Sequence, residues 1–326
     1  MPPKKHKKRL ALRAKGKTEP DTHVPIMVQE VIASLKPAPG QIVVDCTLGY
    51  GGHAKHFIKC IGPTGKFIGL DVDSSQLTRT RRRLSVAGPA VRFHRRNFSE
   101  IEDVLEFEGI DQADVIFADI GVSSMQVDDA SRGISYKSDG PLDMRMDQRL
   151  TITGADLLAT LSQEELSNAL LELSDEPDHE IIATCIVGQR ISAPIATTSQ
   201  LVRLVLNAKG MTERTWKKQQ KKSSFGQLHP AARTFQTLRI MVNDELGSLT
   251  QLLNDAPKCL KAGGRIGIIC FHSGEDRLVK NNFRQNCDDG IYESISKNAL
   301  TPRTGEVVKN PRSASAKFRW AIRSDQ

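Results

Sequence analysis

The sequence predicts an α/β protein in which a doubly wound parallel sheet carries an inserted helical domain. Short runs of β-branched residues alternate with helical stretches over residues 42–119, and a purely helical block follows them. Strands that alternate with helices are typical of a parallel sheet that is covered on both faces. The 326 residues suffice for such a core and one further domain.

The first half of the chain supplies four of the expected strands. They are predicted at residues 42–45, 66–71, 91–94 and 113–119. Helices are expected at 27–35 and 74–86, and one that ends at residue 61 should follow the first strand. Ser99 and Glu102 have the spacing of a capping box, which predicts that another helix begins there.

The second half begins with a polar stretch to residue 147 and continues with helices. Three helix starts are predicted by capping-box pairs: Thr153 with Asp156, Ser162 with Glu165, and Thr197 with Gln200. A long helix is expected over 229–254, and strands over 265–271 and 316–322. The predicted domains are a disordered basic tail over 1–20, a core made of 21–125 and 229–326, and an inserted helical domain over 126–228.

Positive charge is concentrated at the N-terminus. The chain has 46 lysines and arginines against 38 acids, a net charge of +8, and residues 1–17 contain eight of these cations and no acid. The remainder is therefore formally neutral. The tail has little to bury, so we expect it to be disordered, either as an RNA-binding arm or as a solvated tail. A targeting segment is a further alternative.

Composition excludes several classes of protein. No apolar run reaches the roughly 18 residues of a membrane helix, and the start lacks the apolar core of a secretory signal, so we expect an intracellular protein. The six cysteines include no C-x-x-C pair, which predicts reduced thiols rather than a disulfide framework or a zinc site.

A glycine-rich loop after the first strand is the strongest local sign of a ligand. Asp45 ends that strand, Gly49 and Gly51 follow, and Asp71 ends the second strand, 19 residues after Gly52. Glycines allow a tight turn and a close approach to a ligand, and an acid at this position receives ribose hydroxyls in dinucleotide folds. The loop therefore predicts a nucleotide cofactor, with an unliganded glycine turn as the alternative.

Two cofactors compete for this loop. The spacing of its glycines nearly matches the nicotinamide fingerprint. Asp45, however, would repel a pyrophosphate and attract the cationic amino and sulfonium groups of S-adenosylmethionine. We therefore favour S-adenosylmethionine over a nicotinamide cofactor.

Three further residues are candidates for the same crevice. Asp119 ends the fourth strand, where open α/β sheets bind ligands, although a strand-end aspartate also caps helices. Phe98 could cover an adenine face or belong to the core. His53 and His56 share a helical face, but no third ligand is evident, so no metal site is expected.

Longer strings resemble a known family. They are DIGVSSMQ at 119–126, DGPLDMRMD at 139–147, HPAARTFQ at 229–236 and FHSGEDR at 271–277. They are similar to the small-subunit rRNA cytosine-N4 methyltransferase family (methyltransferase H), and the resemblance covers residues 21–323. It implies a class I, Rossmann-like methyltransferase core with a helical insertion. It also implies S-adenosylmethionine as cofactor and a decoding-region cytidine as substrate.

The resemblance also implies a set of cofactor contacts. They would be Gly51, Gly52, His53, Asp71, Phe98, Asp119 and Gln126. The chain departs from the family pattern at four positions, because Met125 replaces a proline, Gly274 a leucine, and Ile134 and Tyr136 phenylalanines. The first two changes put the local loop shape in doubt.

Catalysis requires an acceptor for the N4 proton of cytosine. Asp119 is the candidate, with backbone carbonyls of residues 120–124 as the alternative. For RNA binding, the basic stretch 214–222 surrounds an indole and offers Arg214, Trp216, Lys217 and Lys218 for phosphate contact and base stacking, unless it is a solvated loop. Arg145, Arg233 and Arg239 are further candidates, or partners in structural ion pairs.

Alternative functions remain open at this point. The chain could methylate another RNA or DNA, or act as a non-catalytic ribosome-assembly factor with a retained cofactor crevice. The expected partner is small-subunit rRNA or the assembling small subunit, in a bacterial cytoplasm or alternatively a mitochondrion. The oligomeric state is open, with a dimer as one option.

Overall fold

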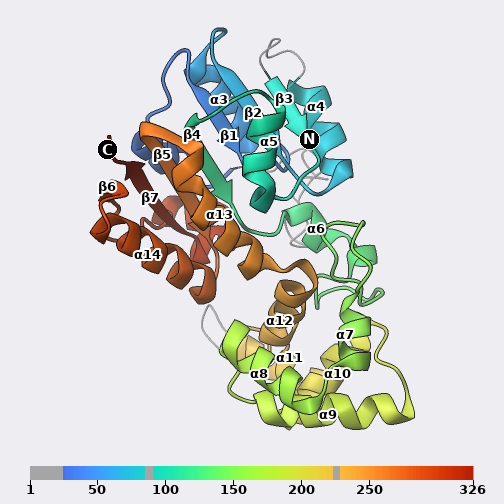
Figure 1. Cartoon of the computed structure of the whole chain (residues 1–326). Coiled ribbons are helices and arrows are strands. Elements are labelled where there is room, and N and C mark those ends of the chain that lie inside the picture. The colour runs from blue at the N-terminus through green and yellow to red at the C-terminus, as the bar shows by residue number, and fades with distance from the viewer. Residues whose placement is uncertain (1–24, 85–90, 223–227, 326) are drawn as a thin grey trace, which may run out of the picture. The chain divides into compact units, whose positions relative to one another are not determined.

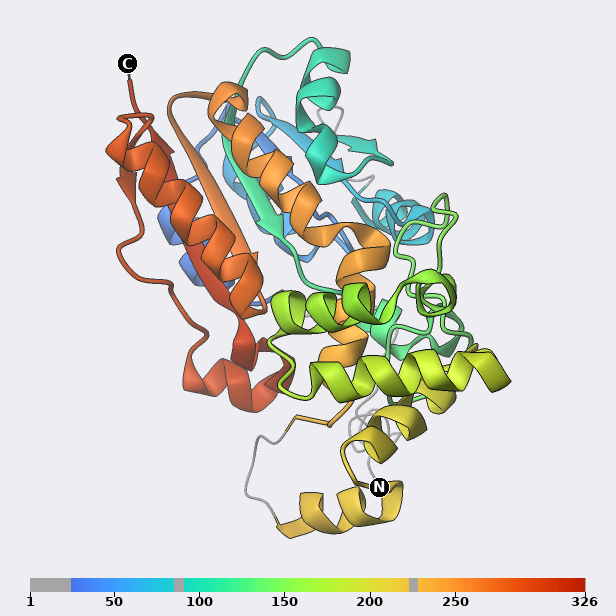
Figure 2. The same cartoon turned by 60° about the horizontal axis from the view of Figure 1, so that its bottom comes forward.

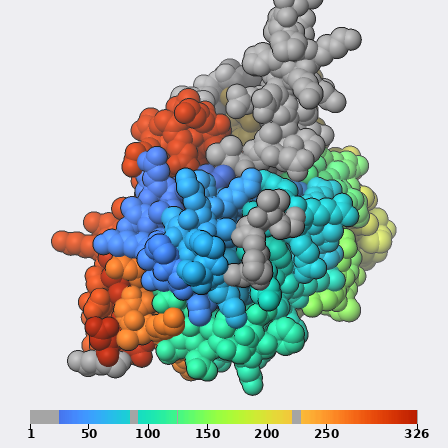
Figure 3. Space-filling view, turned by 90° about the horizontal axis from the view of Figure 1, so that it is seen from above, coloured from blue at the N-terminus to red at the C-terminus, as the bar shows by residue number. Residues whose placement is uncertain are grey.

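The computed structural model describes residues 25–84, 91–222 and 228–325, so the basic tail and its predicted disorder lie outside the described part. The described residues form two compact units. The sheet unit comprises residues 25–122 and 246–325, and the helical unit comprises residues 123–245. Figure 3 shows the two segments of the sheet unit, blue to teal and orange to red, beside one another on one surface.

Seven strands form the sheet in the order β3-β2-β1-β4-β5-β7-β6. Their bounds are β1 Ile42–Asp45, β2 Lys66–Leu70, β3 Val91–His94, β4 Ala113–Asp119, β5 Leu260–Cys270, β6 Tyr292–Ile295 and β7 Lys317–Arg323. The first five strands are parallel, and β7 pairs antiparallel with both β5 and β6. The α/β fold class and the doubly wound sheet are thus confirmed, whereas β6 was not predicted.

Helices cover both faces of the sheet, which is why the strands are apolar without strict alternation. Val44 and Ile116 point into a core with α5 (Ile101–Phe107), α13 (Glu245–Cys259) and α14 (Ser273–Asp288) (Figure 1). Val43 and Phe117 point to the opposite face, into a core with α2 (Val28–Leu35), α3 (Gly52–Ile61) and α4 (Ser74–Leu84). Short segments complete this unit: η2 Phe98–Glu100, α15 Thr304–Lys309 and η4 Pro311–Ser315.

The helical unit has its own apolar core. It contains α6 Ser124–Asp128, η3 Ala130–Arg132, α7 Gly154–Thr160, α8 Gln163–Ser174, α9 His179–Ser192, α10 Thr198–Ala208, α11 Glu213–Lys222 and α12 Ala232–Asn243. Leu158, Leu166 and Leu201 are among its buried side chains. All three predicted capping boxes are present at the starts of α7, α8 and α10. Figure 2 shows α8 beside α9, in agreement with their packing.

Two sequence predictions were wrong in detail. The capping box near residue 100 joins Asn97 to Glu100 around η2, not Ser99 to Glu102. The long helix expected over 229–254 is divided into α12 and α13, because Asp244 adopts a left-handed conformation with φ of 45° that ends α12. The helical unit accordingly extends to residue 245 and includes α12, beyond the expected limit at 228.

Candidate active site

Three aspartates stand at the carboxyl ends of neighbouring strands. Asp45 ends β1, Asp119 ends β4, and Asp71 directly follows β2. Because these strands are parallel and adjacent, their carboxyl ends share one edge of the sheet, where open α/β sheets bind ligands. The sequence prediction for these three residues therefore agrees with their placement.

The glycine loop is tied to this edge by hydrogen bonds. Gly49 and Gly51 have φ of +48° and +68°, which favours glycine. The Asp71 carboxylate accepts the Gly49 N–H at 2.8 Å and the Asp73 N–H at 2.8 Å. A carboxylate has about four acceptor positions, so two remain for the hydroxyl groups of a ribose. These residues fit a nucleoside cofactor.

The middle of α4 supports the same loop from behind. The Thr80 hydroxyl donates to the Gly49 carbonyl at 2.6 Å. A Cβ atom added to Gly51 would come within 2.8 Å of Thr80 Cγ2. Thr80 was not among the predicted residues, because its contact with position 49 spans 31 residues and has no local sequence signal.

His53 and Thr47 complete the edge near Asp119. The His53 Nε2 donates to the Ile26 carbonyl at 2.8 Å, since a carbonyl can only accept. The His53 Nδ1 lies 3.9 Å from Asp119 Oδ2. The Asp119 N–H donates to Thr47 Oγ1 at 2.6 Å, and the Thr47 N–H donates to Asp45 Oδ1 at 3.1 Å. One chain of contacts thus links Asp45 to Asp119.

Burial makes the three carboxyl groups unusually weak acids. Desolvation raises the pKa of Asp45 to about 8, that of Asp119 to about 7 and that of Asp71 to about 6. Repulsion from Asp119 and Asp71 adds to the rise at Asp45. A cationic group placed beside them would favour their ionised forms. The edge therefore suits a positively charged ligand better than a pyrophosphate.

The two remaining predicted cofactor residues differ in their surroundings. Phe98 begins η2 and packs, half-buried, against the core of the sheet unit. Gln126 belongs to α6 of the helical unit, and its Oε1 accepts the Ser123 N–H at 3.1 Å in a capping box. This fold places Gly51, Gly52, His53, Asp71, Phe98 and Asp119 in one unit and Gln126 in the other.

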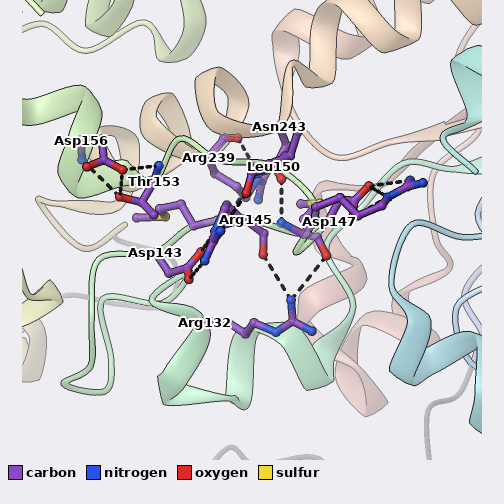
Figure 4. Close-up of polar contacts among 12 residues, drawn as sticks. Arg132, Asp143, Arg145, Asp147, Leu150, Thr153, Asp156, Arg239 and Asn243 are labelled. Atoms are coloured by element: carbon purple, nitrogen blue, oxygen red, sulfur yellow. Dashed lines mark hydrogen bonds and ion pairs between the residues drawn. The ribbon is translucent and has the colours of Figure 1, made fainter. Parts of the chain in front are cut away.

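In the helical unit, residues 139–147 form a network of backbone and ionic contacts (Figure 4). Arg145 donates to both oxygens of Asp143 at 2.8 Å and to the Leu150 carbonyl at 2.7 Å. Asn243 accepts the Met146 N–H at 2.7 Å and donates to the Met144 carbonyl at 2.8 Å. Asn243 was not predicted, because it lies 97 residues from Met146 in the chain.

The predicted RNA-binding residues fall into two groups. Arg145 and Arg239 are engaged in ion pairs, with Asp143 and Glu245 respectively, which agrees with the structural alternative for both residues. Trp216 is 5% exposed and packs edge-on against His229, so the prediction of base stacking by this indole is contradicted. Exposed cations remain at Arg214, Lys217, Lys218 and Arg233.

The sheet topology and the site together define a class of protein. A sheet of this order with an antiparallel β7, a glycine turn after β1 and acids at the ends of β1, β2 and β4 is typical of class I methyltransferases. A model of the MraW methylase family matches residues 21–324, and the chain belongs to this family.

Individual relatives agree with this assignment. The ribosomal RNA small subunit methyltransferase H 1 of Lachnoclostridium phytofermentans is 41% identical over 314 residues, covering 95% of this chain and 84% of the relative. The methyltransferase H of Clostridioides difficile is 38% identical, covering 92% and 98%. The solved structure of an rRNA methylase from Streptococcus thermophilus matches with a TM-score of 0.39 and 8% identity, covering 89% and 91%. Family membership rests on the sequence matches.

Proposed function

We propose that this chain transfers a methyl group from S-adenosylmethionine to N4 of a cytidine in the decoding region of small-subunit rRNA. Membership of the MraW methylase family and the names of the relatives support this reaction. The observation that carries the proposal is the set of three buried aspartates around the glycine loop at one edge of the sheet.

The cofactor, when bound, supplies a methyl group that its sulfonium charge has already activated. In the proposal, Asp71 holds the ribose hydroxyls with its two remaining acceptor positions. Asp45 and Asp119 provide negative charge for the cationic groups, and Gly51 and Gly52 allow the backbone to approach closely. Phe98 covers the adenine, and Gln126 is a further cofactor contact.

The protein must also hold the cytosine amino group in line with the methyl group. Such positioning can contribute roughly 7–11 kcal/mol to a barrier reduction. Asp119 accepts the proton from N4 in this proposal, and its pKa of about 7 suits an acceptor that works near neutral pH. The target base has to leave its stack to reach the methyl group.

The helical unit is proposed to recognise the RNA substrate. Its exposed cations Arg214, Lys217, Lys218 and Arg233 are suited to phosphate contacts. Its partner would be small-subunit rRNA or the assembling subunit, in the bacterial cytoplasm. The described residues contain no helix of the length and apolarity that a membrane span requires.

The decisive experiment is transfer of labelled methyl from S-adenosylmethionine to purified small subunits that lack the modification, followed by nucleoside digestion. Label in N4-methylcytidine is expected. Label in another nucleoside would redirect the proposal to another RNA target. Cofactor binding without any transfer, to subunits or to other RNA, would favour a ribosome-assembly factor instead.

A further inference from the structure

Two neighbouring helices of the sheet unit present cations and no acid. In α3, Lys55 and Lys59 are exposed, and in α4, Arg79, Arg81 and Arg82 are exposed. Neither helix contains an aspartate or glutamate. Both helices pack on the same face of the sheet, through Phe57 and Leu77 among others. These five cations are called the α3–α4 basic surface below.

The surrounding segment is as basic as the N-terminal tail. Residues 46–99 are rich in lysine and arginine and contain only two acids, Asp71 and Asp73. The formally neutral remainder of the chain is therefore strongly polarised. The acids of α5, Glu102, Asp103 and Glu106, belong to the helix on the opposite face of the sheet.

Some cations of this segment have acidic partners and are left out of the surface. Lys66 and Arg92 lie 4.0 Å and 3.8 Å from Glu108, and Arg96 lies 2.9 Å from Glu100. The basic surface consists of the residues on the two helices, where the local sequence supplies no counter-charge.

The basic surface is continuous with the cofactor loop. Arg79 donates to the Tyr50 hydroxyl at 3.1 Å, and Tyr50 stands between Gly49 and Gly51. Arg81 lies over the Phe93 ring at 6.0 Å and donates to the Phe93 carbonyl at 3.3 Å. These contacts hold two long side chains in place, which lowers the entropy lost when they bind a partner.

We propose that the α3–α4 basic surface binds the phosphate backbone of the substrate RNA, outside the nucleotide that is methylated. The inference rests on the proposed function for its choice of RNA. Arginine forks match phosphate geometry, and several cations without local acids raise the potential that attracts a polyanion. The surface would add a second, backbone-directed contact to those of the helical unit.

The helix dipole and an anionic membrane each account for less of this charge pattern than RNA does. Favourable interaction with the helix dipole explains cations in a last turn, such as Arg81 and Arg82, but not Lys55 or Arg79. An anionic membrane surface usually requires exposed apolar side chains beside the cations. Neither α3 nor α4 exposes a large hydrophobic residue.

The test compares two variants that lose the same charge. The first carries Lys55→Gln, Lys59→Gln, Arg81→Gln and Arg82→Gln, and leaves Arg79 at the cofactor loop intact. The control carries Lys280→Gln, Arg284→Gln, Lys297→Gln and Lys309→Gln, which lie elsewhere in the sheet unit. Thermal unfolding and S-adenosylmethionine affinity should equal those of the wild type in both.

The readout is binding to unmodified small subunits over a range of KCl concentrations, with the KM for methyl transfer as a second measure. For the first variant we expect weaker binding, a higher KM and an unchanged kcat at saturating subunit. The slope of log K against log [KCl] should become shallower by about three, since each phosphate contact contributes about 0.7–0.9. The control should retain most of the wild-type affinity and salt slope.

The outcomes separate this inference from the proposed function. If the first variant and the control bind alike, the basic surface does not contact RNA. If it loses affinity only for phosphatidylglycerol vesicles, a membrane contact replaces the inference. If the wild type binds subunits without methylating them, the proposed function fails, while the binding comparison still tests the surface.

Discussion

The three aspartates at the sheet edge hold their protons more strongly than ordinary carboxyl groups, because burial raises the pKa of each. A cationic ligand must therefore bind to carboxyl groups that are partly protonated near neutral pH. Ligand affinity and proton affinity oppose each other at this edge, and that competition can be measured.

We expect the affinity for S-adenosylmethionine to rise between pH 5.5 and 7.5, as Asp71 and Asp119 ionise with pKa values of about 6 and 7. S-adenosylhomocysteine has the same amino group but no sulfonium charge, so its affinity should rise less steeply. Calorimetric titration of both ligands across this range measures the difference. Identical pH profiles would mean that the carboxylates do not act on the sulfonium.

Asp119→Asn should lower kcat by about 10²–10⁴-fold, the usual contribution of a positioned proton acceptor. The backbone bond from position 119 to Thr47 does not involve the side chain and can remain. Single-turnover methylation at saturating cofactor checks this prediction. Retained turnover would transfer the role to the backbone carbonyls of residues 120–124.

Asp45→Asn should stabilise the protein increasingly as pH rises from about 4 to about 8. Asp45 has a pKa of about 8 in the folded chain and close to 3.8 when unfolded, so the wild type loses stability over this interval. Asparagine can still accept the Thr47 N–H. Urea unfolding at pH 5 and pH 8.5 measures the gain, with the exposed Asp111→Asn as control. An equal gain at both pH values would contradict the assignment.

At the scale of elements, the glycine turn and α4 depend on each other. Gly51→Ala would place a left-handed alanine within 2.8 Å of Thr80 Cγ2 and 3.0 Å of Leu84 Cδ1. Gly109 has a similar φ of +64° and nothing within 4 Å, so Gly109→Ala isolates the conformational cost, roughly 1–2 kcal/mol. Gly51→Ala should cost a further ~1–3 kcal/mol through overpacking.

Urea unfolding and cofactor titration of both glycine variants test this coupling. Gly51→Ala should weaken S-adenosylmethionine binding at least tenfold, whereas Gly109→Ala should leave it unchanged. If the two variants lose equal stability, α4 yields to the added methyl group without cost.

Elements were predictable where the signal is local. The parallel strands are short apolar runs between turns, and the capping boxes are four-residue patterns, so both can be found in the sequence. The break at Asp244 was not, because a left-handed aspartate has no distinctive neighbours. β6 was missed for a related reason: its four residues pair only with β7.

The site shows the same division. Asp45, Asp71 and Asp119 were predictable because strand ends in a parallel sheet share an edge. Trp216 was misjudged, because its neighbours in the sequence are cations, while its ring turns into a core built from distant helices. Asn243 and Thr80 act through contacts across 99 and 31 residues, which no local pattern encodes.

For the whole molecule, charge segregation predicts two separable contributions to RNA binding. Residues 1–17 carry eight cations, and the α3–α4 basic surface carries five. Deleting residues 1–17 should make the salt slope of subunit binding shallower, by as much as about six if every charge contacts a phosphate. Filter binding at several KCl concentrations measures the slope. An unchanged slope would show that the tail makes no phosphate contacts.

The division of the sheet unit into two chain segments also governs how the protein emerges from the ribosome. β4 ends at residue 119, and its neighbour β5 begins at residue 260, so 260 − 119 = 141 residues separate them. At about 5–20 residues per second, synthesis leaves the β4 edge without its partner for roughly 7–28 s. The helical unit is contiguous and can fold during this interval. The nascent four-stranded sheet meanwhile exposes an apolar strand edge, which makes this stage the one most dependent on chaperones.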